Sequence, residues 1–146
     1  MKIIADTNVI LRLLVSGTSD EDAKQALVAA ELLERCDAVI FPTHAFCEMV
    51  WVMQRGYRFT AAEIVAGIEK VLCIKNLVFN ADEVAAGLRM LEKGGDFADG
   101  VNACAGQAMA HDSDAAFASF DKEAVKLLGK QGVKTLLLET PEQTDD

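Results

Sequence analysis

Asp96-Phe97-Ala98-Asp99-Gly100-Val101-Asn102-Ala103-Cys104-Ala105 begins with two acids three residues apart and continues with small and apolar residues. This order predicts the first turns of a helix, with Asp96 as its cap and Asp99 as the reciprocal partner in the cap. Three other acids, Asp6, Glu48 and Asp121, lie far away in the sequence, at positions where a fold can bring them to Asp99. We therefore predict one acidic pocket.

Length and composition are typical of one globular domain. The chain has 146 residues, of which 51% are hydrophobic, enough to bury a substantial core. We predict one folded domain over residues 1–138 and a polar tail over residues 139–146. No apolar run is long enough to cross a membrane, and residues 1–6 are too short and too soon acidic for a signal peptide.

The four cysteines stand singly, without a Cys-x-x-Cys pair. This pattern is typical of buried thiols in a reducing compartment and disfavours disulfides or zinc ligation. We therefore expect a cytoplasmic protein without a membrane partner.

The chain is acidic, with 14 Lys and Arg against 23 Asp and Glu and a net charge of −9. This is the wrong general sign for a protein that neutralises phosphates, and the right sign for holding divalent cations or a basic protein partner. Solubility alone is an equally good explanation of the charge.

Short apolar runs alternate with helical patterns along the chain. The expected strands are residues 2–5, 38–41, 77–79, 115–119 and 133–138. The expected helices are residues 9–15, 20–36, 44–54, 61–73, 81–93, 96–110 and 122–128. This order predicts an α/β fold with a short parallel central sheet of about four or five strands, flanked by helices. In such sheets the functional crevice lies at the carboxyl ends of the strands, where Asp6 and Asp121 stand.

Each acid also has a simpler interpretation. Asp6 and Asp121 precede helices and can be ordinary helix caps. Glu48 lies in the otherwise apolar stretch 45–53, where an unpaired buried carboxylate is costly, although a salt bridge or a solvent-facing position remains open. Carboxylates gathered in one place repel one another and raise their pKa values, so a cluster implies a cation. An all-oxygen set favours Mg²⁺ or Mn²⁺, and such sites hydrolyse phosphodiesters.

The ordered set of acids resembles the PIN-domain ribonucleases, and specifically the VapC-type toxins of type II toxin–antitoxin operons. The matching segments are Asp6-Thr7-Asn8-Val9, Glu48, Asp96-Phe97-Ala98-Asp99 and Ala118-Ser119-Phe120-Asp121. Their order and spacing and the length of the chain all fit, so the resemblance covers nearly the whole sequence.

The resemblance implies a three-layer domain and a Mg²⁺-dependent endoribonuclease in which Mn²⁺ substitutes. Its catalytic and metal-binding residues would be Asp6, Glu48, Asp99 and Asp121. Four further residues would support them: Asn8 and Ser119 as polar partners, Thr7 as a cap or loop holder, and Asp96 as a neighbour or only a cap. Similar proteins cut RNA, form homodimers and are silenced by a cognate antitoxin.

Two other functions remain open at this point. One is a Mg²⁺-dependent aspartyl-phosphate phosphotransfer protein, either a phosphatase or a receiver, since both use an Asp after the first strand. The phosphatases place a second Asp two residues later, where this chain has Asn8. The other is a non-catalytic PIN-like module that binds a basic partner.

Several other residues are open to more than one interpretation. Gly100 and Asn102 stand where many relatives have Ala and a large aliphatic residue, and the sequence leaves their effect undecided. Met49, Trp51 and Met53 are expected in the core or on a dimer surface. A set of basic residues can form a phosphate-binding rim or simply face solvent: Arg12, Arg35, Arg55, Arg58 and Lys93.

Overall fold

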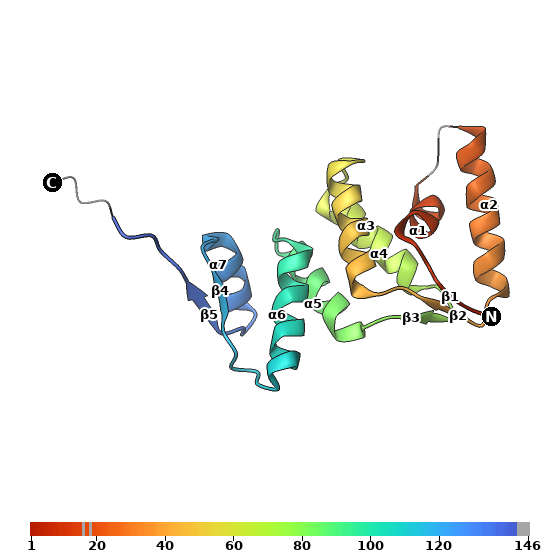
Figure 1. Ribbon diagram of the computed structural model, residues 1–146. Coiled ribbons are helices and arrows are strands. Elements are labelled where there is room, and N and C mark those ends of the chain that lie inside the picture. The colour runs from red at the N-terminus through yellow and green to blue at the C-terminus, as the bar shows by residue number, and fades with distance from the viewer. Residues whose placement is uncertain (16, 18, 143–146) are drawn as a thin grey trace. The chain divides into compact units, whose positions relative to one another are not determined.

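The computed structural model describes residues 1–15, 17 and 19–142, and it confirms the mixed α/β class with short parallel strands (Figure 1). The chain divides into two compact units, Met1–Val84 and Ala85–Asp146. All five expected strands form, as a three-stranded and a two-stranded sheet. Residues 143–146 of the expected tail lie outside the described residues.

The first unit contains a parallel sheet in the order β1-β2-β3, made of β1 (Lys2–Ile4), β2 (Ala38–Ile40) and β3 (Leu77–Val78). Its helices are α1 (Thr7–Leu14), α2 (Asp20–Arg35), α3 (Thr43–Arg55) and α4 (Ala61–Leu72). In the central strand, Val39 is fully buried and lies in register with Ile3 on one side and Leu77 on the other. In Figure 1, β1 leads from the sheet directly into α1, which packs against α2, α3 and α4.

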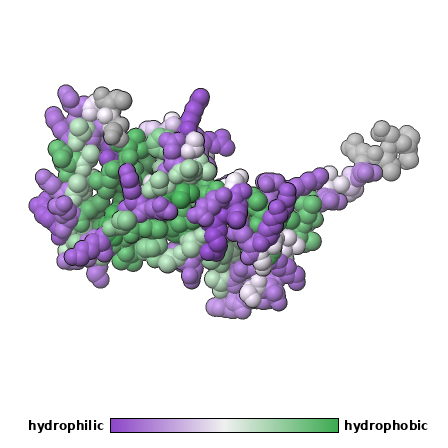
Figure 2. All heavy atoms as spheres, turned by 180° about the vertical axis from the view of Figure 1, so that it is seen from behind, coloured by the Kyte–Doolittle hydropathy of each residue, from purple (hydrophilic) through white to green (hydrophobic). Residues whose placement is uncertain are grey.

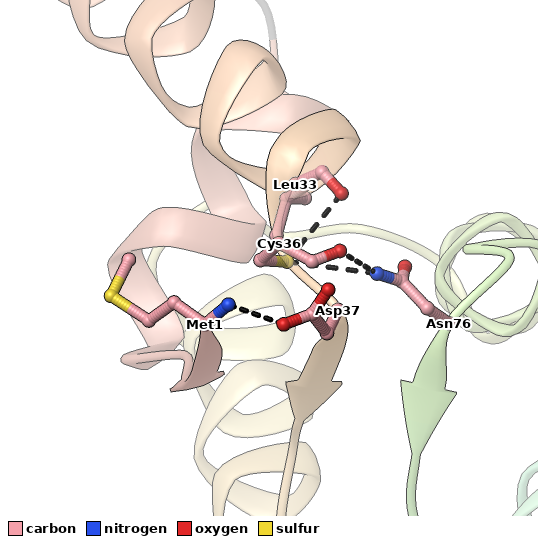
Figure 3. Close-up of polar contacts among 5 residues, drawn as sticks. All are labelled: Met1, Leu33, Cys36, Asp37 and Asn76. Atoms are coloured by element: carbon pink, nitrogen blue, oxygen red, sulfur yellow. Dashed lines mark hydrogen bonds and ion pairs between the residues drawn. The ribbon is translucent and has the colours of Figure 1, made fainter.

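Polar contacts tie the amino ends of these three strands together (Figure 3). The terminal ammonium of Met1 pairs with the carboxylate of Asp37 and holds the pKa of that carboxyl below its usual value. The Asn76 side-chain amide donates to the Cys36 carbonyl over 2.6 Å. Met1, Asp37 and Asn76 each precede a strand, so these contacts lie at the amino ends of the three strands. Asp6 follows β1 and therefore lies at the opposite, carboxyl end.

The core of the first unit is built from large apolar side chains of the sheet and α3. Phe41 and Phe46 are fully buried and their ring centroids are 4.7 Å apart. Met49 and Met53 are core residues, whereas Trp51 is 59% exposed. Figure 2 shows hydrophilic residues protruding around the rim of this unit, with hydrophobic residues between them.

The second unit contains α6 (Phe97–Ala110), β4 (Phe117–Ser119), α7 (Lys122–Lys130) and β5 (Thr135–Leu137), and the boundary between the units falls within α5 (Ala81–Glu92). β4 and β5 pair in parallel, with Phe117 opposite Thr135. The core of this unit includes a hydrophobic cluster of Met90, Ala103, Leu127 and Leu128, with Phe117 and Val133 packed against it. None of the described helices is both long and apolar enough to cross a lipid bilayer.

Gly100 allows α5 and α6 to approach closely within the second unit. A Cβ atom at this position would lie 2.4 Å from the backbone oxygen of Ala86. No side chain tolerates such a contact with backbone, so the departure noted in the sequence is a packing requirement of these two helices.

Candidate metal site

Asp6 lies at the carboxyl end of the strands of the first sheet, between β1 and α1. Its backbone has the extended conformation of an N-cap residue, with φ −72° and ψ 151°, but its carboxylate accepts no hydrogen bond from the first turn of α1. The interpretation of Asp6 as an ordinary side-chain cap is therefore wrong. The side chain is exposed, and its carboxylate is not used by the helix that it precedes.

Glu48 faces solvent from α3, so the argument that its carboxylate is buried among apolar residues is wrong. Its side chain is 53% exposed, because the buried face of the helix is occupied by other residues of the stretch, namely Ala45, Phe46, Met49, Val50 and Met53. The carboxylate is held from two sides. Thr7 donates from Oγ1 to Oε2 over 2.9 Å, and Nε2 of His44 lies 3.4 Å from Oε1.

The Thr7 and His44 contacts were not predicted from the sequence. Thr7 is the first residue of α1 and is buried, with 7% of its surface exposed, so its hydroxyl joins α1 to α3. His44 precedes Glu48 by one helical turn, and this spacing is the signal that could have identified the pair. Asn8, the expected polar support, is exposed on α1 and lines a cavity of about 330 Å³ beside α2.

In the second unit, Asp96 caps α6, and its Oδ1 accepts from the Ala98 amide over 3.0 Å. The reciprocal cap predicted between Asp96 and Asp99 does not form, because no side-chain bond returns from Asp99 to the cap backbone. Asp99 is instead partly buried in the first turn of α6. Burial raises the pKa of its carboxyl, and the neighbouring charges of Asp96 and Asp121 raise this pKa further.

Asp121 caps α7, as its simpler interpretation proposed. Its Oδ1 accepts from the amides of Glu123 and Ala124 over 3.0 and 3.1 Å. Ser119 Oγ in turn accepts from the Asp121 amide over 3.0 Å and holds the turn between β4 and α7. Only one oxygen of the Asp121 carboxylate is used in the cap, so the other remains open to a further ligand.

The four acids belong to two units: Asp6 and Glu48 to the first, Asp99 and Asp121 to the second. Within either unit, the described residues include no group of three or more His, Cys, Asp or Glu side chains that could hold a metal ion. Convergence of the four acids requires both units and stays a prediction. Their chemistry nevertheless fits Mg²⁺ or Mn²⁺, because every donor is a carboxylate and the repulsion at Asp99 would be relieved by a cation.

An α/β fold with acids placed after parallel strands and at helix starts is an arrangement suited to metal-dependent phosphodiester chemistry. The PIN domain family model matches residues 3–129 of this chain, which therefore belongs to the PIN domain family. PIN domains are typically nucleases and usually use divalent metals. Searches of the curated proteins and of the solved structures found no match. The VapC-type subgroup stays a prediction.

Proposed function

We propose that this PIN domain is a Mg²⁺-dependent endoribonuclease and the toxin component of a toxin–antitoxin pair. The observation that carries the proposal is Asp99. Its carboxyl makes no cap bond, and its pKa is raised first by partial burial and then by the neighbouring charges of Asp96 and Asp121. The ionised form of this carboxyl is disfavoured in the metal-free protein, and a bound cation would stabilise it. The match to the PIN domain family supports a nuclease.

Asp6, Glu48, Asp99 and Asp121 would hold the ion, with Mn²⁺ able to replace Mg²⁺. When bound, the metal supplies activation of a water molecule and neutralisation of charge on the scissile phosphate. The protein residues would hold the carboxylates in position for the metal. Asp6 offers a carboxylate that is not used by its own helix, and Asp121 is fixed in place by two backbone amides.

RNA is the proposed substrate, and a homodimer and a cognate antitoxin are the proposed protein partners. The net charge of −9 favours an antitoxin with basic residues, because an Arg or Lys inserted among the acids would compete with the metal. The same charge requires that RNA be held by local features of the surface and not by the field of the whole protein.

The first test measures RNA cleavage and metal binding by the full chain in parallel. We expect Mg²⁺- or Mn²⁺-dependent cleavage that Asp6→Asn or Asp99→Asn abolishes, together with weaker Mn²⁺ binding in calorimetry. Asp82→Asn, an exposed acid at the start of α5, is the matched control and should retain both properties. Cleavage that persists in the Asp6→Asn, Asp99→Asn double variant would exclude this site as the catalytic one.

The toxin assignment requires a separate test in cells. Induced expression of the chain should arrest growth, and Asp6→Asn should relieve the arrest at equal protein level. A small DNA-binding protein encoded beside it should restore growth when expressed together with the unchanged chain. Arrest that is equally strong with the Asp6→Asn variant would separate toxicity from nuclease activity.

A further inference from the structure

The solvent-facing side of α3 forms a single stripe that begins beside the candidate site. His44, Glu48, Trp51 and Arg55 are all exposed, and they are spaced by four, three and four residues along the helix. Trp51, the only tryptophan of the chain, is 59% exposed. At about 1.5 Å of rise per residue, Arg55 lies about 10 Å along the helix from Glu48. The stripe therefore runs from an acid of the site to an exposed aromatic ring and then to a cation.

The turn after α3 continues the stripe with the same two kinds of side chain. Tyr57 and Phe59 are stacked, with ring centroids 5.5 Å apart and an interplanar angle of 25°. Arg58 between them has a left-handed backbone, with φ 55°. The Gly56 amide donates to the Val52 carbonyl over 2.7 Å, and the Phe59 amide to the Met53 carbonyl over 2.9 Å. These bonds tie the turn back onto α3 and hold Tyr57 and Arg58 in exposed positions.

The charge of this segment is opposite to that of the whole protein. Between Met49 and Ala62 the only charged residues are Arg55 and Arg58, so the segment carries +2 in a chain of net charge −9. Arginine pairs with phosphate through two parallel hydrogen bonds, and exposed aromatic rings offer faces on which bases stack. This combination of cations and exposed aromatic rings is typical of surfaces that bind single-stranded nucleic acid.

We propose that α3 and the following turn bind single-stranded RNA, with Trp51 and Tyr57 stacking on bases and Arg55 and Arg58 pairing with phosphates. The proposal rests on the proposed function and extends it, because the track would lead the strand toward Glu48. It favours unpaired RNA, since the faces of paired bases are covered by their neighbours and are not accessible to a protein ring. Of the rim residues considered from the sequence, it selects Arg55 and Arg58.

The single tryptophan provides a direct measurement. An oligouridine of about 12 nucleotides is titrated into the full chain at low salt with a chelator present, so that binding is followed without cleavage. We expect the fluorescence of Trp51 to be quenched by the single strand and to change little with the same strand paired to oligoadenosine. Binding detected by anisotropy of a labelled oligouridine, without any change in Trp51 fluorescence, would overturn the stacking assignment.

Substitutions separate stacking from charge. Trp51→Ala should weaken oligouridine binding at least about fivefold, from the usual contribution of one stacked base. Leu27→Ala, at an apolar residue of α2 that is 67% exposed, should leave binding unchanged. Arg55→Gln with Arg58→Gly should reduce the dependence of log affinity on log salt by about 1.4, or about 0.7 per phosphate contact. Arg35→Gln, at the end of α2, is the charge control. Glycine at position 58 also suits the left-handed backbone, so a loss of binding there is not a loss of fold.

The outcomes distinguish this proposal from the nuclease proposal. Oligouridine binding that depends on Trp51, in a chain that cleaves no RNA, would support the track and contradict the enzyme. Metal-dependent cleavage with unchanged affinity in the Trp51→Ala and Arg55→Gln, Arg58→Gly variants would overturn the track alone. A fall in molar mass of the Trp51→Ala variant by light scattering, with unchanged RNA affinity, would assign this face to a second copy of the chain and likewise overturn the track.

Discussion

Thr7 donates a hydrogen bond of 2.9 Å to the carboxylate of Glu48, a residue 41 positions away on another helix. Thr7 follows Asp6 directly and is buried at the start of α1. Its hydroxyl therefore holds the Glu48 carboxylate beside the residue that follows Asp6. Two of the proposed metal ligands are therefore held in a fixed relation by a residue that is not an acid. Partners of this kind commonly set the affinity of a metal site.

Thr7→Val should lower metal-dependent cleavage about 10- to 100-fold, because the side chain keeps its shape and loses the donor that orients Glu48. Thr7→Ser retains the hydroxyl and should keep most of the activity. Cleavage rates at several Mn²⁺ concentrations, with a thermal melt of each variant, make the comparison. Equal rates for the Val and Ser variants would show that the Thr7–Glu48 bond has no part in activity.

Asp99→Asn should stabilise the metal-free protein at neutral pH. The pKa of Asp99 is raised in the folded state from its ordinary value of 3.8, so the contribution of this group is fully present below that value and is lost as pH rises through the raised pKa. Because the group is only partly buried, the gain should be on the order of 1 kcal/mol or less. The difference in melting temperature between variant and parent should shrink as pH is lowered.

Added Mg²⁺ provides the control for this prediction. It should raise the melting temperature of the parent chain, since a ligand that binds the folded state stabilises it, and should have little effect on Asp99→Asn. An Asp99→Asn variant that is less stable than the parent at neutral pH in chelator would contradict the raised pKa of Asp99, which burial and the charges of Asp96 and Asp121 produce.

Asp121→Ala should destabilise the protein by about 0.5–2 kcal/mol, because two backbone amides lose their cap acceptor. Asp6→Ala should cost less than about 0.5 kcal/mol, since its carboxylate caps nothing. Urea unfolding of the two variants in chelator gives the comparison, and Asp121→Asn, which keeps an acceptor, should lie near the parent. Equal losses at both positions would contradict the observed difference between the caps.

Gly100→Ala and Gly106→Ala should have opposite effects although both lie on α6. At Gly100 the new Cβ would meet the Ala86 backbone oxygen at 2.4 Å, and the strain should cost about 1–3 kcal/mol. At Gly106 an added Cβ would meet no described atom within 4 Å beyond its chain neighbours and the helix's own backbone, so alanine should stabilise the helix by up to about 1 kcal/mol. Chemical unfolding of both variants measures the difference, and stabilisation by both substitutions would show that α5 and α6 are not in close contact.

Local chemistry in the sequence was sufficient to predict where most elements begin and end. The capping box of Thr60 and Glu63 at the start of α4 is such a local feature, because its residues are three positions apart and need no distant partner. The short strands were predicted from their apolar runs alone, although the structure buries these runs only in part: Ile4 is 75% exposed and Leu136 is 53% exposed. The α/β class, the parallel pairing and the PIN family follow from these local patterns and from the order of the acids.

Only the tertiary structure decided what each acid does. Asp6 and Asp121 both stand between a strand and a helix, yet Asp121 caps its helix and Asp6 does not. Glu48 lies among apolar neighbours in sequence, but the helical period turns it toward Thr7 and solvent. Such differences depend on the rotation of a helix and on partners tens of residues away. A linear pattern specifies which groups are present, and packing specifies which of them are left free to bind something else.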